Sequence, residues 1–457
     1  MTCVLYVHAK GGPPPSHALA RVAAKATVHL LALAEPPASI AAELAQWCAS
    51  VTRTVRGEER DLVDVIVERA REVGAEAVIT FSEYAVVAVS QACLRLGLRG
   101  AGSSAGLARD KRLMRIAWDV HRVPQPRFRA VTTLADLQAA AAELSPPLLL
   151  KSAWSAGSTA HQVIKTPADA AGAWERSRQV MEESADLGYA ELYVPGARED
   201  FVVEEIVEGD ARGWFAGEGW GDYVSVEGVV ADGIFHPVCL TGRMPTVTPF
   251  TERAGITPAA MTAGIQDRIV DLARRAVDAL GLEDCGTHTE IKLGADGRMW
   301  VIETAARFGG AMTVPQVEQA FGIDLVGGLT DQLLGRDPGW PARVQDARDA
   351  RGASGSLVVL AVHADGTPWS ERRTWRTEDI VRSAPVTPGN AFGVVVESSL
   401  PDGELVPEYD PAAGANTMAG LCTLSADDPQ SVLDDLAAVI DAMPSILRAP
   451  RTRGSVV

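Results

Sequence analysis

The chain has 457 residues, which is enough for three or four domains of ordinary size. Apolar residues make up 47% of the chain and charged residues 22%, a composition typical of a globular protein. The formal net charge of −17 argues against a general nucleic-acid-binding protein, because phosphate backbones are bound by clustered lysine and arginine. We interpret the acidity mainly as a source of solubility.

The cysteine pattern and the hydropathy indicate the compartment. Six cysteines lie singly, with no C-x-x-C pair, which favours neither a disulfide framework nor a zinc site. The chain opens on a short apolar run, Val4 to Val7, without the basic and apolar regions of a signal peptide. No apolar stretch is long enough to cross a bilayer. We therefore expect a cytoplasmic protein with no membrane partner.

The first hundred residues alternate buried β-like runs with amphipathic helical stretches. The pattern predicts strands at Val4–Val7, Val28–Leu33 and Ala77–Thr80, and helices at His17–Ala26 and Asp61–Val73. This alternation is typical of an open βαβ sheet. The glycine-proline run after the first strand lacks the G-x-G-x-x-G fingerprint, so we predict no dinucleotide site there.

The middle of the chain mixes helices with β-rich stretches. In chain order we expect a helix at Arg109–Asp119, a helix at Leu134–Leu144 capped by Thr133, strands at Leu148–Ala153 and Asp200–Val207, β structure from Trp214 to Leu240, and a long helix at Thr262–Leu280. Residues 335–351, rich in Asp, Arg and Pro, are typical of a linker to a final β-rich domain.

A hairpin at Thr287–Thr304 carries a pair of acidic side chains. Hydrophobic alternation on both sides of Asp296-Gly297 predicts a two-residue type I′ loop, and symmetric folding about it places Glu290 opposite Glu303. Like charges directly opposite on a sheet are destabilising unless something compensates for them, and a divalent cation beside a triphosphate would do so. The alternative is a solvated face that carries two screened glutamates. Alternation also places His288 on the face of Glu290.

Two lysines are candidates for phosphate contacts. Lys111 lies near the start of a helix, and Lys151 ends an apolar strand. A lysine in that place is awkward in a core and useful beside a phosphate, although a lysine that reaches from the strand end to solvent remains the alternative. The small-residue loop that follows offers backbone N–H groups to phosphates, mainly at Ser155, Gly157 and Ser158. The Walker A pattern is absent.

A third element is the strand that ends in Glu204-Glu205-Ile206-Val207. Such a strand can present backbone groups to adenine and carboxylates to the amino and ribose groups of a nucleotide. It is a weak motif by itself, and its order and spacing relative to the lysines and the paired glutamates strengthen it.

Together these pieces resemble the ATP-grasp superfamily and, within it, the L-amino acid ligases, the bacilysin-synthetase-like enzymes. The stretches that carry the resemblance are 204–209, 214–219, 222–228, 249–252, 256–258, 287–293 and 303–310. The resemblance implies an α/β (α+β) ATP-grasp fold. Its domains are a βαβ open-sheet domain at 1–105, a central ATP-grasp domain at 106–210, a catalytic subdomain at 211–335 and a C-terminal domain at 336–457.

The resemblance also implies roles for single residues. Lys111 and Lys151 would bind the ATP phosphates, and the 204–207 strand would lie on the adenine side. Glu290 and Glu303 would hold Mg²⁺, with Mn²⁺ as an alternative. Arg307 would stabilise an acyl phosphate, so Arg307 and Lys151 are the expected catalytic residues. The expected substrate contacts are Glu252, Gly255, His288, Arg307, Gly310 and Ala311, with His288 positioning substrate rather than binding metal.

The sequence departs from the family pattern at three positions. Ala305 stands where many ATP-grasp enzymes have an asparagine, which leaves metal binding to the two glutamates. Ala311 replaces a bulky tryptophan, and Gly255 replaces a histidine. The last two changes enlarge the pocket and make it less polar, so they affect the substrate and not the chemistry.

The resemblance therefore predicts an enzyme, an ADP-forming ligase that joins an amino acid carboxylate to the amine of a second amino acid through an acyl phosphate. The alternatives are another ATP-grasp reaction, either ligation to a different amine or biotin-carboxylase-like carboxylation, and a non-catalytic ATP-binding protein. The expected partners are small amino acids and a second copy in a homodimer, with no nucleic acid.

Overall fold

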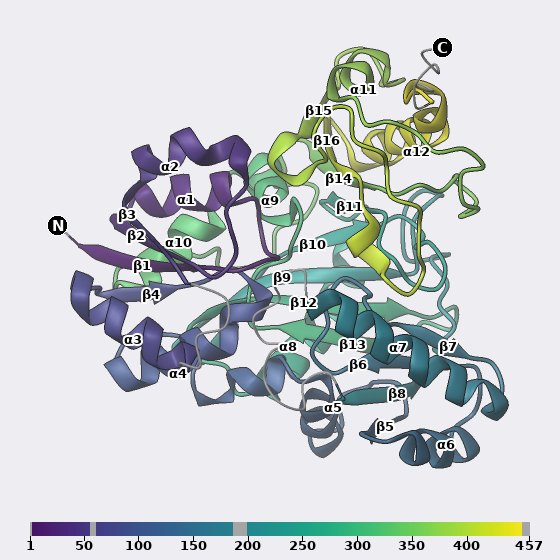
Figure 1. Cartoon of the computed structure of the whole chain (residues 1–457), viewed down its shortest axis with the longest axis horizontal. Coiled ribbons are helices and arrows are strands. Elements are labelled where there is room, and N and C mark those ends of the chain that lie inside the picture. Colours follow the sequence, from purple (N-terminus) through teal and green to yellow (C-terminus); the bar gives the residue numbers. More distant parts are fainter. Residues whose placement is uncertain (1, 55–60, 186–198, 450–457) are drawn as a thin grey trace, which may run out of the picture.

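The computed structural model describes residues 2–54, 61–185 and 199–449. The strands within these ranges form two four-stranded sheets and one eight-stranded sheet. Figure 1 shows the N-terminal sheet on the left, the eight-stranded sheet across the middle and the second small sheet at the lower right. None of the helices over the described residues combines the length and apolar character that a membrane span requires.

The N-terminal sheet is parallel, in the order β3-β2-β1-β4. Its strands are β1 (Cys3–His8), β2 (Thr27–Ala32), β3 (Cys48–Arg53) and β4 (Ala77–Ile79). The predicted open βαβ sheet is confirmed. Strand β3 escaped prediction because its Cys-Ala-Ser-Val-Thr-Arg sequence is only partly buried and lacks clear alternation.

Helices cover both faces of this sheet. One face packs on α3 (Leu62–Val73) and α4 (Val86–Leu96). The other packs on α1 (Pro15–Ala23), α2 (Ala41–Trp47) and α10 (Leu325–Leu333), the last from some three hundred residues further along the chain. The N-terminal sheet therefore completes its core with a distant segment, and this brings its strand ends next to the residues that precede α10.

The second four-stranded sheet is antiparallel, in the order β5-β8-β6-β7. Its strands are β5 (Phe128–Val131), β6 (Leu148–Ser152), β7 (Gln162–Ile164) and β8 (Phe201–Glu205), with α6 (Leu134–Glu143) and α7 (Ala170–Ala185) packed on them. Helix α6 begins with a capping box in which Thr133 accepts from the Asp136 N–H, as the sequence predicts.

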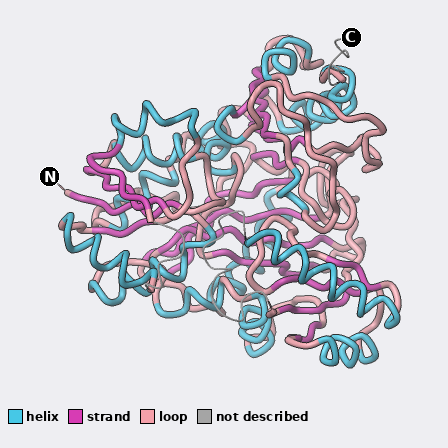
Figure 2. The backbone as a smooth tube through the Cα atoms, in the orientation of Figure 1, coloured by secondary structure: helices cyan, strands magenta, loops and turns pink. Residues whose placement is uncertain are grey.

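The eight-stranded sheet has the order β13-β12-β9-β10-β11-β14-β16-β15. Its strands are β9 (Tyr223–Ala231), β10 (Ile234–Arg243), β11 (Ala254–Thr257), β12 (Cys285–Leu293), β13 (Met299–Ala305), β14 (Ala353–Val359), β15 (Ala391–Val395) and β16 (Gly420–Ala426). The helices around it are α5 (Lys111–Val120), α8 (Ala263–Asp278), α9 (Thr313–Phe321), α11 (Thr377–Ser383) and α12 (Pro429–Ile446). Figure 2 shows the strands running through the middle of the molecule and helices around them.

The last strands of the chain continue this sheet. Strand β14 pairs with β11 over four residue pairs, from Ala254↔Leu357 to Thr257↔Ser354. Helix α12 then packs on β14 and β16 through Val432, Leu436 and Val439. The domain boundary expected near residue 335 stays a prediction, and the sheet hydrogen bonds run across it.

The predicted two-residue loop of the β12–β13 hairpin is wrong. Strand β12 ends at Leu293 and β13 begins at Met299, and these two residues pair. Between them the Gly294 N–H donates to the Arg298 carbonyl at 2.9 Å, and Gly297 has a φ of 77°. A longer loop with a left-handed glycine is the next commonest hairpin connection after the two-residue turns.

The predicted pairing of the two glutamates is nevertheless confirmed. The ladder runs Leu293↔Met299 to Ile291↔Val301 and then shifts by one residue, so that Glu290 pairs with Glu303. The extra residue is Ile302, a β-bulge of the kind that is frequent beside active sites. The ladder beside the loop is one residue out of the predicted register, since Leu293 pairs with Met299 and not with Trp300, and the bulge makes up this one residue.

Candidate active site

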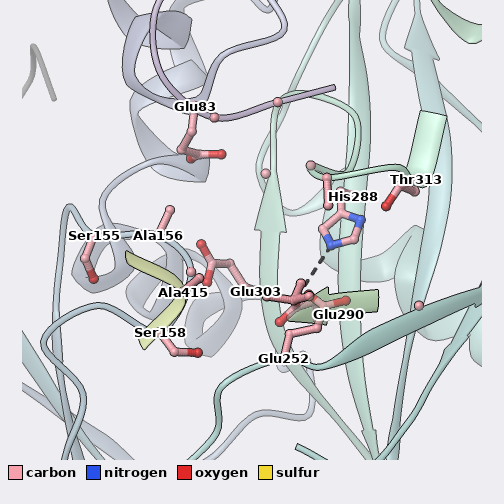
Figure 3. A pocket seen from close by; sticks show the side chains of 18 of the residues that line it. Glu83, Ser155, Ala156, Ser158, Glu252, His288, Glu290, Glu303, Thr313 and Ala415 are labelled. Atoms are coloured by element: carbon pink, nitrogen blue, oxygen red, sulfur yellow. Dashed lines mark ion pairs between the residues drawn. The ribbon is translucent and has the colours of Figure 1, made fainter. Parts of the chain in front are cut away.

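Residues from all three sheets line one cavity of about 730 Å³. Every residue that the sequence assigns to nucleotide, metal or substrate lies on its wall. In Figure 3, Glu290, Glu252 and His288 lie on one side of this cavity, and Ser155, Ala156, Ser158 and Ala415 lie on the facing side. The structure therefore brings together residues spread over more than two hundred positions of the chain.

Glu290 is ionised at neutral pH. Burial raises the pKa of its carboxyl, but contacts with the His288 imidazole and the charges of Arg243 and Lys151 bring it to about 2. Opposite it, Glu303 Oε1 lies 3.2 Å from Lys111 Nζ. The two carboxylates thus face one another with cationic groups around them, which differs from the alternative of two solvent-screened glutamates.

His288 is held between two carboxylates. Its Nδ1 lies 2.8 Å from Oε1 of the fully buried Glu227, and its Nε2 lies 3.5 Å from Glu290 Oε1. Burial lowers the pKa of His288, but Glu227 and Glu290 outweigh this and raise it to about 9. An imidazolium has no lone pair for a metal ion, which favours a positioning role for His288 over metal binding.

Both predicted phosphate lysines are buried. Lys111 Nζ donates to the Ser155 carbonyl at 2.6 Å, and Lys151 forms an ion pair with Glu204. Each lysine side chain is 7% exposed. A lysine that reached from a strand end to solvent would be far more exposed, so this alternative is wrong for Lys151.

Glu204 does not offer a free carboxylate to a nucleotide. Its Oε1 pairs with Lys151, and its Oε2 accepts from Arg115 Nη2 at 2.8 Å. Burial raises the pKa of Glu204, but Arg115 and Lys151 lower it to about 2. Arg115, itself buried, escaped the sequence reasoning because its partner lies 89 residues away. The only feature of the sequence that could have indicated Arg115 is its position in the helix, one turn after Lys111.

The 155–159 loop is closed by distant segments. Gly157 and Ser158 both have left-handed φ angles, 65° and 61°. The Ser158 hydroxyl donates to the Phe250 carbonyl at 2.9 Å, and the Ala415 N–H donates to the Gly157 carbonyl at 3.0 Å. The C-terminal segment around Ala415 is therefore part of the cavity wall, which the sequence did not indicate.

Arg307 pairs with an acid from the segment that follows β4. Its Nε lies 2.5 Å from Glu83 Oε2, and Arg109 Nε lies 3.6 Å from Glu83 Oε1. Burial alone would raise the pKa of Glu83, but Arg307, Arg109 and Lys111 hold it below its usual value. The sequence reasoning missed Glu83, although a charged residue shortly after a buried parallel strand such as β4 is a recognisable signal.

The remaining predicted substrate residues lie together around a second arginine. Arg243 Nε lies 2.7 Å from Glu252 Oε1, and Gly255 is the strand partner of Arg243. A Cβ atom at Gly310 would meet only the backbone of Gly12, at 3.8 Å. Ala311 has a φ of 50°. Small residues at 255, 310 and 311 leave this end of the cavity wide.

The donor set fits a magnesium ion. Glu290 and Glu303 supply two opposed carboxylates, and no cluster of three or more His, Cys, Asp or Glu suited to a metal occurs within the described ranges. A cation held by this pair would fill its other positions with water and phosphate oxygens, as Mg²⁺ commonly does and as Zn²⁺ in a closed structural site does not.

Comparisons with known proteins identify a family for part of the chain. Residues 144–315 match the ATP-grasp domain family. The alanine–anticapsin ligase of Bacillus subtilis (strain 168) is 36% identical over 293 residues, which cover 63% of this chain and 60% of that ligase. A D-alanine–D-alanine ligase of Pseudomonas entomophila (strain L48) is 24% identical over 241 residues, which cover 51% of this chain and 66% of the relative. The alignment thus spans well under two thirds of the alanine–anticapsin ligase.

The fold extends further than the sequence similarity. The crystal structure of an L-amino acid ligase from Bacillus licheniformis matches with a TM-score of 0.74 and 17% identity, over 99% of both chains. That of a phosphoribosylglycinamide synthetase from Anaerococcus prevotii matches with a TM-score of 0.62 and 15% identity. The chain therefore carries an ATP-grasp domain and has an ATP-grasp fold over nearly its whole length.

Proposed function

We propose that this chain is an ATP-dependent ligase that joins the carboxylate of one amino acid to the amine of a second, forming ADP and phosphate. The observation that carries this proposal is the placement of Glu290 opposite Glu303 in one cavity with Lys111, Lys151 and Arg307. Two of the relatives are named as an alanine–anticapsin ligase and a D-alanine–D-alanine ligase, and these names support the same class of reaction here.

The nucleotide would lie in the part of the cavity that is lined by β6, the end of β8 and the 155–159 loop. Ile206 and Val207, at the end of β8, would contact adenine together with Leu149 from β6. Lys111 and Lys151 would face the phosphates. The negative charge of the phosphates would balance these buried ammonium groups, whose counterions are otherwise glutamates. The 155–159 loop would add backbone N–H donors and keep water away from the reacting groups.

Glu290 and Glu303 would hold the divalent cation, Mg²⁺ or, as an alternative, Mn²⁺. Bound there, the ion would supply positive charge beside the β- and γ-phosphates and help orient them for transfer. His288 keeps the Glu290 side chain in place through the contact of 3.5 Å, and Glu227 in turn fixes the imidazole ring.

Arg307 would serve the acyl-transfer half of the reaction. The donor carboxylate attacks the γ-phosphorus and ADP leaves, which gives an acyl phosphate. The acceptor amine then attacks the acyl carbon, phosphate leaves, and the nitrogen loses a proton. The guanidinium of Arg307 can neutralise the acyl phosphate and then the oxyanion; its Nη1 donates to the Phe308 carbonyl at 2.8 Å and Glu83 is its counterion.

The wide end of the cavity would take the substrates. Gly255, Gly310 and Ala311 leave room there, and Glu252 is half-exposed on the same wall. The space at Gly310 and Ala311 favours side chains bulkier than that of alanine on the activated amino acid. A homodimer and a cytoplasmic location are further parts of the proposal.

The test is ADP and phosphate release from Mg-ATP with pooled L-amino acids, followed by mass spectrometry of the products. We expect an amide of two amino acids, one ADP per amide, and slower ADP release by the Glu290→Gln variant at the same Mg²⁺ concentration. Release that depends on bicarbonate instead would favour carboxylation. ATP binding without ADP formation in any pool, including pools of other amines, would favour a non-catalytic protein.

A further inference from the structure

Arg243 is a buried arginine whose guanidinium faces the same cavity. It lies at the end of β10 and is 1% exposed. Its Nη2 donates to the Ser225 hydroxyl at 2.8 Å, and its Nη1 donates to the carbonyls of Thr241 and Gly242 at 3.3 and 3.2 Å. These contacts hold the guanidinium rigidly, which is the condition for selective recognition of a planar anion.

The Nε–H group of Arg243 has no acceptor in line with its N–H bond. Glu252 Oε1 lies 2.7 Å from Arg243 Nε, yet the buried Nε has no partner with hydrogen-bond geometry. The Glu252 side chain is 43% exposed, so solvent reaches this partner while the guanidinium itself is buried. Arg243 is therefore a fixed cation whose nearest counterion is partly exposed and imperfectly aligned with Nε.

Gly255 lies against the guanidinium at the edge of the cavity. A Cβ atom built at this position would lie 3.4 Å from Arg243 Nη1, and any larger side chain would extend across the guanidinium. Gly255 itself has no left-handed φ, so backbone conformation does not require glycine here. The absence of a side chain matters for the space that it leaves in front of Arg243.

Strand β9 lies between Arg243 and the strand that carries Glu290. Glu290 on β12 pairs with Ser225 on β9, and Arg243 lies on β10, beyond β9. Arg307 follows β13 on the other side of the glutamate pair. The two guanidinium groups thus flank the glutamates. A ligase of two amino acids binds two carboxylates. The donor carboxylate reacts with the γ-phosphate and must approach it, whereas the acceptor carboxylate stays intact and need not.

We propose that Arg243 binds the intact carboxylate of the amine acceptor, so that the acceptor is an amino acid with a free carboxylate and not a simple amine. The inference rests on the proposed ligase function. In this arrangement the acceptor carboxylate takes the place of Glu252 on Nε, and the acceptor amine is directed towards the acyl phosphate beside Arg307. Glu252 no longer pairs with Arg243 in this arrangement and lies next to the amino group of the bound acceptor.

The experiment compares the twenty L-amino acids with their primary amides as acceptors, by kcat/KM in product formation. A charge-assisted hydrogen bond of this kind corresponds to about tenfold to 100-fold in binding. We expect the wild-type protein to prefer the acid by at least tenfold, mainly through KM. The preference should fall towards unity in Arg243→Met, and it should recover in part in Arg243→Lys.

Two further variants separate recognition from a structural effect. Gly255→Leu covers the guanidinium without removing it and should raise the KM of the acid more than that of the amide. Arg253→Met is the matched control, because Arg253 is also buried but donates to the carbonyls of His363 and Ala364 away from the cavity. It should keep the wild-type preference for the acid.

The outcomes distinguish this inference from the proposed function. Hydroxylamine in place of the acceptor traps an acyl phosphate as a hydroxamate and tests the ligase chemistry by itself. Hydroxamate formation together with equal use of acids and amides by the wild-type protein would overturn the role of Arg243 alone. An unchanged preference in Arg243→Met would do the same. No hydroxamate with any amino acid would contradict the ligase proposal, and this inference with it.

Discussion

The buried pair between Arg115 and Glu204 allows a quantitative prediction for the variant Arg115→Met. Arg115 lies behind the cavity wall, and its Nη2 is 2.8 Å from Glu204 Oε2. The pKa of Glu204 is about 2 instead of 4.5, which corresponds to roughly 3 kcal/mol in favour of the ionised carboxylate. Removal of one partner of a buried pair typically costs on the order of 3 kcal/mol or more, because the other charge stays buried.

We therefore expect the free energy of unfolding at pH 7 to fall by about 3 kcal/mol in Arg115→Met, measured by urea denaturation with circular dichroism. The matched control is Arg129→Met, which breaks an exposed pair with Glu143 and should change stability little.

The loss of stability in Arg115→Met should become smaller as the pH falls. The folded-state pKa of Glu204 is depressed, so its contribution is complete above the unfolded value of 4.5 and is lost as the pH falls towards 2. The difference between wild type and Arg115→Met should therefore shrink between pH 4.5 and the acid limit. If Arg115→Met cost no more than Arg129→Met at pH 7, or if the loss persisted undiminished in acid, the assignment of the pair would be refuted.

Three further predictions concern activity. Glu290→Gln should raise the Mg²⁺ concentration needed for half-maximal ADP release at least about tenfold, and an unchanged Mg²⁺ titration would remove Glu290 from the metal site. Arg307→Ala should lower kcat by roughly 1000-fold while nucleotide affinity, measured by calorimetry, survives; equal loss of both would contradict a role in acyl transfer. Ala311→Trp should narrow the wide end of the cavity and raise the KM of bulky donor amino acids about tenfold more than that of alanine, and a uniform change across donors would place residue 311 outside the donor pocket.

Much of the site was predictable because its patterns are local. Alternation along 287–304 is enough to place Glu290 opposite Glu303, since the side-chain period of a strand is two residues and the pairing follows from it. The five residues between β12 and β13 were not predicted; they shift the register by one residue, and the one-residue bulge at Ile302 restores it. Lys151 was predictable for a similar reason, as a charge at the end of an apolar strand.

The partners of these residues were not predictable. Glu83 meets Arg307 across 224 positions of sequence, and Arg115 meets Glu204 across 89. No periodicity links such pairs, because they depend on how whole sheets and helices pack. The wall around Ala415 has the same origin, since a C-terminal turn reaches the 155–159 loop only after β14 joins the eight-stranded sheet.

The sequence by itself therefore determined the kinds of groups in this protein and their order along the chain: two acids on a hairpin, two lysines and an arginine after the second acid. Short-range geometry is sufficient for this, because helix and strand periods place neighbours in sequence on a common face. The tertiary structure alone decided which acid stands beside which base, and hence which groups are ionised and held rigid. Burial and charge pairing arise from contacts between distant segments, and these contacts form only when the chain has folded.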